Sequence, residues 1–145
     1  MEPDRSWRAV FPAVPGAVQA AASWLDASLP RPALPERLVF ALGLCVEELL
    51  MNTHMHGVCT DSDPVAAIRI DLFPDRLVLA YEDNAQPFDV TQAPERRLDR
   101  PLTDIAPGGL GLQLVRRFSD RIDYEELDGG NRVTCIFMRS GAEKS

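Results

Sequence analysis

The chain has 145 residues and a mass of 16.0 kDa, which predicts a single domain over residues 1–145, since domains hold roughly 100–200 residues. Its net charge of −7 and pI near 4.8 argue against a nucleic-acid partner, because phosphate binding needs a basic face. Hydrophobic residues make up 46% of the chain and charged residues 26%, as in folded globular proteins.

Lysine is almost absent from the chain. The 15 Lys and Arg residues include a single lysine, Lys144. Walker A loops, eukaryotic-type protein kinases and Schiff-base enzymes each depend on a lysine at the phosphates or in a pocket. A nucleotide-binding function would therefore have to use backbone amides, carboxylates, side-chain amides and arginine.

Cysteine and histidine usage argues against disulfides and zinc. The three cysteines, Cys45, Cys59 and Cys135, are odd in number and lack a C-x-x-C spacing, which is typical of reduced thiols. His54 and His56 have no cysteine beside them, as a zinc motif would require. No run of about 18 apolar residues and no basic leader occurs, so we expect a cytoplasmic protein with no membrane partner.

The N-terminal part of the chain is predicted to form a strand and two helices. Residues Ser6–Phe11 alternate like a strand, and a helical pattern then runs from Val14 to Leu29 before a proline-rich stretch ends it. The longest helical pattern spans Pro35–His56, with Gly57 as the expected C-terminal cap. Apolar residues surround most of this helix, which predicts burial nearly all round.

The C-terminal part is predicted to form two hairpins separated by a loop and a helix. The four strands are expected at Val65–Leu72, Arg76–Glu82, Ile122–Leu127 and Arg132–Arg139. Residues 84–107 contain four prolines and show no period, which is typical of a functional lid; a helix from Gly108 to Ser119 follows. Strands that arrive in pairs predict an α+β fold, a two-layer α/β sandwich with a mixed, mainly antiparallel sheet and helices on one face.

Glu48, Asn52 and His56 are spaced by four residues on the long helix and so form one stripe along it. Glu47 and His54 fall on a separate stripe, which we expect to face solvent. A carboxylate and an amide amid apolar side chains must be paired or used, because burying a lone charge is costly. Such a pair could be a general base beside a magnesium ligand. On the helix alone, an ordinary exposed pair explains the spacing equally well.

Two further segments could contact a nucleotide. Asp83 ends a predicted strand directly before a turn, where its carboxylate could face a pocket, although Asp-Asn also signals an ordinary turn. The segment Gly108-Gly109-Leu110-Gly111-Leu112 opens a helix, where free backbone amides attract phosphate. Close packing alone also accounts for such glycines.

Taken in order, these motifs resemble one protein family. They are Glu48-x-x-x-Asn52-x-x-x-His56-Gly57, Asp83-x-Ala85-x-Pro87-Phe88-Asp89, Gly108-Gly109-Leu110-Gly111-Leu112 and a closing Gly129-Gly130-Asn131 hairpin. The set resembles the GHKL (histidine-kinase-like) ATPases and, more narrowly, the bacterial anti-sigma factor serine kinases of the RsbW and SpoIIAB type. The resemblance covers nearly the whole chain.

The resemblance implies the Bergerat ATPase fold, with ATP and Mg²⁺ as cofactors. It implies that Glu48 is the base that activates the acceptor hydroxyl, that Asn52 binds Mg²⁺ and ATP, and that Asp83 accepts the adenine amino group beside Ala85. It implies phosphate binding by the backbone amides of Gly109, Leu110, Gly111 and Leu112. Arg96, Arg97 and Arg100 of the lid could reach the γ-phosphate, although they are more simply explained as solvated loop charges.

The function that the resemblance implies is a serine/threonine protein kinase, expected as a homodimer. It would bind a sigma factor or an equivalent regulator and phosphorylate a STAS-domain anti-anti-sigma protein. Ala85 stands where that family usually has glycine, and a positive φ there would cost alanine about 1 kcal/mol and weaken ATP binding. The alternative is therefore an ATP-binding or nucleotide-free module that sequesters a partner without phosphorylating it. A sensor histidine kinase fits less well, because no phosphoacceptor hairpin precedes the predicted ATP domain.

Overall fold

A computed structural model of the chain describes residues 1–30, 33–57, 59, 62–92 and 109–140. The strands are β1 (Arg5–Pro12), β2 (Val65–Leu72), β3 (Arg76–Asp83), β4 (Arg121–Leu127) and β5 (Gly130–Met138). The helices are α1 (Ala17–Ser28), α2 (Glu36–His56) and α3 (Gly109–Phe118), with a short 3₁₀ helix, η2 (Val90–Gln92). This order of strands and helices is the one predicted from the sequence.

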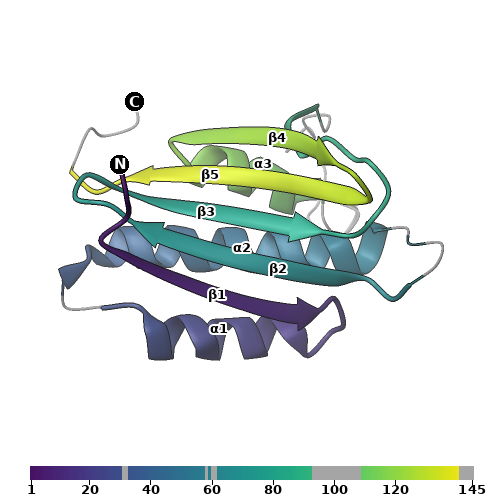
Figure 1. Ribbon diagram of the computed structural model, residues 1–145, viewed down its shortest axis with the longest axis horizontal. Helices are drawn as coiled ribbons and strands as arrows, with labels where there is room; N and C mark the ends of the chain where they lie inside the picture. Colours follow the sequence, from purple (N-terminus) through teal and green to yellow (C-terminus); the bar gives the residue numbers. More distant parts are fainter. Residues whose placement is uncertain (31–32, 58, 60–61, 93–108, 141–145) are drawn as a thin grey trace.

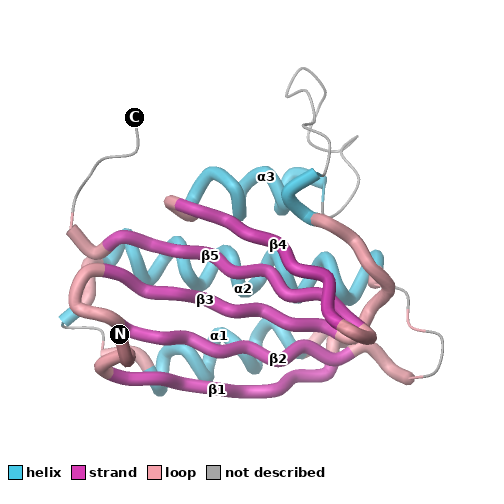
Figure 2. The backbone as a smooth tube through the Cα atoms, turned by 45° about the horizontal axis from the view of Figure 1, so that its top comes forward, coloured by secondary structure: helices cyan, strands magenta, loops and turns pink. Residues whose placement is uncertain are grey.

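The five strands form one sheet in the order β1-β2-β3-β5-β4. The three α-helices lie on one face of it, as Figures 1 and 2 show. The α+β sandwich is confirmed. All four strand pairings are antiparallel, so within the described strands the sheet is antiparallel throughout and not mixed.

The second hairpin begins its return strand earlier than expected. A two-residue Asp128-Gly129 turn connects β4 to β5, with Gly129 at a φ of +81°, a conformation that favours glycine. Strand β5 therefore starts at Gly130 and not at Arg132. Asn131 becomes a strand residue, directly opposite Asp83 of β3.

Helix α2 lies at the centre of the helical layer and supplies much of the core. Leu42, Val46 and Leu49 are almost completely buried against the sheet. Burial nearly all round is wrong, however, because Phe40 is 63% exposed and Met55 is 43% exposed. The helical layer is one helix deep, and the described residues leave this outer side of α2 largely open.

Helix α2 is also long and apolar enough to cross a membrane by length and composition. Half of its most apolar window is buried inside the protein. The core helix of a soluble protein meets the same two criteria, so they are weak evidence for a membrane span.

Candidate functional site

Glu48 and Asn52 occupy adjacent turns of the C-terminal half of α2, as their spacing predicted. Asn52 is only 9% exposed, and Glu48 is half-buried. In the described part of the chain, neither side chain has a hydrogen-bond or salt-bridge partner. Burial raises the pKa of the Glu48 carboxyl above its usual value, and the neighbouring charge of Glu47 raises it further. Glu47 and His54 are exposed, as expected for the other stripe.

A cavity of about 30 Å³ lies between the end of α2 and the ends of β3 and β5. Asn52, Asp83 and Ala85 all line it, so the structure brings these predicted site residues together. The cavity is lined further by Leu49, Thr53, His56, Gly57, Tyr81, Gln86, Phe88, Val90, Asn131 and Val133.

Asp83, the last residue of β3, accepts three hydrogen bonds from the protein. Its Oδ1 accepts from Asn131 Nδ2 at 2.8 Å and from the Ala85 amide at 3.2 Å. Its Oδ2 accepts from Thr53 Oγ1 at 2.9 Å. Because a carboxylate oxygen has two lone pairs, Oδ1 is fully used and Oδ2 keeps one acceptor position. The neighbouring Asn84 has a structural role, since its side chain binds the backbone of Asp63 and Val65.

Thr53 and Tyr81 fix the direction of the bond to Oδ2, and the sequence analysis did not select either residue. The Tyr81 hydroxyl lies 2.7 Å from Thr53 Oγ1. Thr53 has one hydroxyl proton and donates it to Asp83, so Tyr81 must donate to Thr53. Burial raises the pKa of Tyr81 well above its usual value, which keeps this proton in place. The sequence did contain a sign of both residues. Tyr81 lies two positions before Asp83 on the same face of the predicted strand, and Thr53 directly follows Asn52.

Asn131 of β5 is a third residue of the site to which the sequence analysis gave no role, because it was assigned to a turn. The two protons of its amide nitrogen are shared among three acceptors: Asp83 Oδ1 (2.8 Å), Ala85 O (3.2 Å) and Gln86 O (3.1 Å). Its amide oxygen accepts from the Phe88 backbone N–H at 2.9 Å and from the Tyr124 hydroxyl. Asn131 thereby holds Asp83 and the first residues after β3 in one arrangement.

The preceding glycine makes this arrangement possible. A Cβ on Gly130 would lie 2.0 Å from the backbone oxygen of Asp83. No other residue allows β5 to approach the end of β3 so closely without a shift of the backbone. Gly57 has a similar role at the end of α2, where a Cβ would lie 2.5 Å from Thr53 O. Gly57 is the predicted cap, with an extended backbone (φ −69°, ψ 123°).

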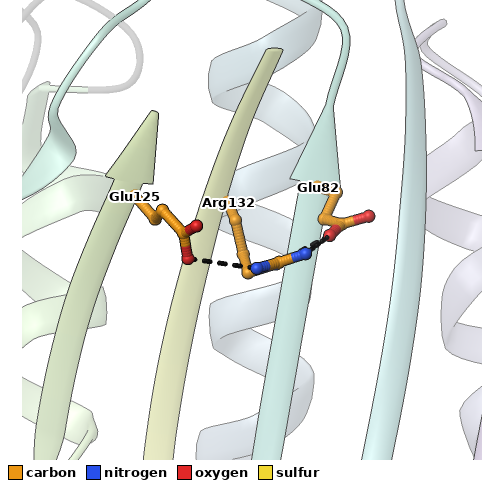
Figure 3. Close-up of polar contacts among 3 residues, drawn as sticks. All are labelled: Glu82, Glu125 and Arg132. Atoms are coloured by element: carbon orange, nitrogen blue, oxygen red, sulfur yellow. Dashed lines mark hydrogen bonds and ion pairs between the residues drawn. The ribbon is translucent and has the colours of Figure 1, made fainter. Parts of the chain in front are cut away.

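Arg132 holds the same part of the sheet together from its other face (Figure 3). Its guanidinium binds Glu82 of β3 through Nε and Nη2 at 2.7 and 2.6 Å, and Glu125 of β4 through Nη1 at 3.1 Å. Consecutive strand residues point to opposite faces. Asn131 therefore fastens the site from the helical side of the sheet, and Arg132 ties three strands together on the open side.

Ala85 adopts its place without backbone strain. No described residue other than glycine has a positive φ, so the condition under which alanine would be costly is not met. The residue is 5% exposed, and its methyl group faces the space above Gly57.

The remaining predicted residues lie at α3 or beyond the described part of the chain. Helix α3 begins at Gly109 and includes Leu110 and Gly111, and Leu112 is buried in the core. The start of α3, the end of α2 and the end of β3 lie at the same end of the molecule (Figure 1). The first amides of a helix have no partner within it. Gly108 and the lid residues Arg96, Arg97 and Arg100 lie outside the described residues.

This end of the molecule combines four chemical features. It has a half-buried carboxylate with a raised pKa, an amide without a partner among the described residues, an acceptor-only carboxylate in a cavity, and a helix N-terminus. Such a set can bind an amino-substituted ring and an anionic group, and it can accept a proton from a nucleophile.

Comparisons with known proteins agree with this arrangement. Residues 11–137 match the family model of the histidine kinase-like ATPase domain. The chain is 39% identical over 113 residues to the serine/threonine-protein kinase BtrW of Bordetella bronchiseptica, covering 77% of this chain and 78% of that protein. It is 27% identical over 101 residues to the serine-protein kinase RsbW of Bacillus licheniformis, covering 64% of this chain and 60% of that protein.

Two solved structures share the fold. One contains the RsbU and RsbW domains of Rv1364c from Mycobacterium tuberculosis, with a TM-score of 0.64 and 15% identity over 97% of this chain and 34% of that chain. The other is the histidine kinase domain of a blue-light activated kinase from Erythrobacter litoralis, with a TM-score of 0.54 and 18% identity over 89% of this chain and 62% of that chain.

Proposed function

The chain belongs to the histidine kinase-like ATPase family, and from this premise we propose that it is an ATP- and Mg²⁺-dependent serine/threonine protein kinase of the anti-sigma factor type. It acts in the cytoplasm as a homodimer, binds a sigma factor or an equivalent regulator, and phosphorylates a STAS-domain antagonist. One observation carries the proposal: Glu48 and Asn52 stand on adjacent turns of α2 with no partner among the described residues, beside the cavity that contains Asp83.

The residues present are suited to Mg²⁺ and ATP. Asn52 lines the cavity, and its side-chain amide has no hydrogen-bond partner among the described residues and reaches solvent, so it is available to a ligand. Mg²⁺ takes oxygen ligands, and it often uses only one or two from the protein and the rest from water and phosphate. Asn52 would hold the metal through its side-chain oxygen, and the bound metal would neutralise charge on the phosphates.

Glu48 acts as the proton acceptor of this proposed kinase. The serine or threonine oxygen of the substrate forms a bond to the γ-phosphorus, the bond from that phosphorus to the β–γ bridging oxygen breaks, and the hydroxyl proton passes to Glu48. ADP leaves with the bridging oxygen. Burial raises the pKa of Glu48 and so makes its carboxylate a stronger base than an exposed one.

Asp83 selects the base of the nucleotide. Because Asn131, Ala85 and Thr53 donate to it, its oxygens face the cavity as acceptors with one position left on Oδ2. An exocyclic amino group, as in adenine, can donate there. The carbonyl oxygen that guanine has at the same place would meet a carboxylate, which disfavours it.

The rival function is a module that sequesters a partner without phosphorylating it, and it was considered because Ala85 could weaken ATP binding. Ala85 has no positive φ, so backbone strain at this position does not favour the rival. The two relatives reported above are named as protein kinases, which supports the catalytic function.

Phosphate transfer tests the proposal directly. The protein is incubated with radiolabelled ATP, Mg²⁺ and a candidate STAS-domain protein from the same organism. We expect labelling of a serine or threonine in that protein and its loss in Glu48→Gln, with ATP affinity within about threefold of wild type. Asn52→Ala should lose the effect of Mg²⁺ on ATP affinity. Full transfer by Glu48→Gln would refute the assigned base.

A further inference from the structure

An apolar groove lies between α1 and the N-terminal half of α2, away from the nucleotide cavity. Its volume is about 680 Å³, within the range of pockets that bind ligands. Figures 1 and 2 show the two helices side by side on the same face of the sheet. Its walls are mostly aliphatic, and Phe40, which is 63% exposed, stands at its edge.

Gly43 in this groove has no role in the described fold. It lies in the interior of α2, where glycine destabilises a helix by about 0.5–1 kcal/mol relative to alanine. A Cβ added to Gly43 would meet no atom within 4 Å. No close contact among the described residues therefore requires a glycine at this position. The glycine does leave the groove open for the close approach of another molecule.

The charges around the groove indicate what that molecule is. Asp26, Glu36 and Glu47 are its charged lining residues, and no described basic residue lines it. All three are exposed. An apolar groove with an acidic rim complements an amphipathic helix whose apolar stripe is flanked by lysine or arginine. The same rim on two copies would repel, which disfavours a symmetric contact of this face with a second copy of the chain.

We propose that the groove between α1 and α2 binds a basic amphipathic helix of a partner protein. The proposal deepens the proposed function, because it assigns the capture of a protein target to a surface separate from the phosphate-transfer site. The groove extends along α2 as far as Glu47, next to Glu48, but none of its lining residues lines the nucleotide cavity. A captured helix would thus leave the nucleotide cavity accessible.

The test uses the full-length protein and two synthetic peptides. Both are 18 residues long and helical with the same leucine stripe, and one carries lysine and the other glutamate on its polar face. Backbone amide shifts of the protein are recorded during titration with each peptide. We expect the lysine peptide to shift α1 and residues 36–47, and to bind at least about tenfold more tightly than the glutamate peptide.

Gly43→Met and Ala20→Met form a matched pair of variants. Gly43→Met fills the groove and should weaken the lysine peptide about tenfold, whereas Ala20→Met adds the same side chain on an exposed part of α1 that does not line the groove and should not. Unchanged melting temperatures and ATP affinities would show that both variants are folded.

Three results would overturn the proposal: shifts centred on the nucleotide cavity, equal affinity for both peptides, or full binding by Gly43→Met. Shifts of the groove amides that depend only on protein concentration would assign the groove to a second copy and would also overturn it. Failure of phosphate transfer with groove binding intact would refute the kinase function alone.

Discussion

The bonds from Tyr81 to Thr53 and from Thr53 to Asp83 can be tested by a double-mutant cycle. Thr53 and Tyr81 are 1% and 2% exposed, so water cannot replace a lost partner. Thr53→Val keeps the shape of the side chain but leaves the Tyr81 hydroxyl buried without an acceptor, which costs about 1–3 kcal/mol. It also removes one donor to Asp83, a half-buried group that water can partly rehydrate. We expect Thr53→Val to lower the free energy of unfolding by about 2–4 kcal/mol.

The double variant distinguishes this bond from a general effect of packing. Tyr81→Phe removes the donor and leaves Thr53 still bound to Asp83, so it should cost only about 1 kcal/mol. In Thr53→Val/Tyr81→Phe no buried hydroxyl is left unpaired. The double variant should therefore be more stable than the sum of the single effects predicts, by about 1–2 kcal/mol.

Urea unfolding followed by the fluorescence of Trp7 and Trp24 measures all four proteins. With a slope of about 1–3 kcal/mol per molar urea, the Thr53→Val midpoint should fall by roughly 1–2 M. Additive single effects, or a Thr53→Val variant as stable as wild type, would contradict the assigned bond from Tyr81 to Thr53.

Three other predictions concern the candidate site. Burial raises the pKa of Glu48 in the folded protein. The protonated group therefore stabilises the folded protein at pH values below the ordinary pKa of glutamate, and this stabilisation is lost as the pH rises through the pKa of the folded state. Glu48→Gln should therefore unfold at higher urea than wild type at pH 7 and at the same urea at pH 3; the reverse order at pH 7 would be inconsistent with the burial. Ala85→Gly should lower the stability by about 0.5–1 kcal/mol without tightening ATP binding in calorimetry, and a tenfold gain in affinity would mean that the methyl group obstructs the nucleotide. Gly130→Ala should cost at least about 1–3 kcal/mol in urea unfolding, because its Cβ would lie 2.0 Å from Asp83 O, and an equally stable variant would disprove the close approach.

Local patterns in the sequence predicted the helices and strands and selected Asn52, Asp83 and Ala85, which the structure places around one cavity. Alternation and helical periodicity located each strand and helix to within a few residues, because these patterns depend on neighbours in the sequence. The same periodicity placed Glu48 and Asn52 together on α2. The predicted burial of Phe40 was wrong because composition does not show how many layers cover a helix.

The residues that were missed depend on the order of strands in the sheet. A hairpin can join a sheet by either of its strands, and here β5, not β4, pairs with β3. That pairing brings Asn131 opposite Asp83, 48 positions away in the sequence. Thr53 and Tyr81 meet only because α2 packs across the same end of β3. Contacts of this kind follow from tertiary packing and leave no periodic signal.

Asn131 and Arg132 bind the end of β3 from opposite faces of the sheet, and these bonds affect local opening of the folded protein. Amide hydrogen exchange proceeds through local opening wherever a segment can separate at low cost. Separation of the end of β3 from β5 has to break the bonds of Asn131 on one face and those of Arg132 on the other. The amides of Asp83 and Asn131 should thus exchange more slowly than those at strand ends without such ties, which would place this wall of the cavity in a slowly exchanging part of the sheet.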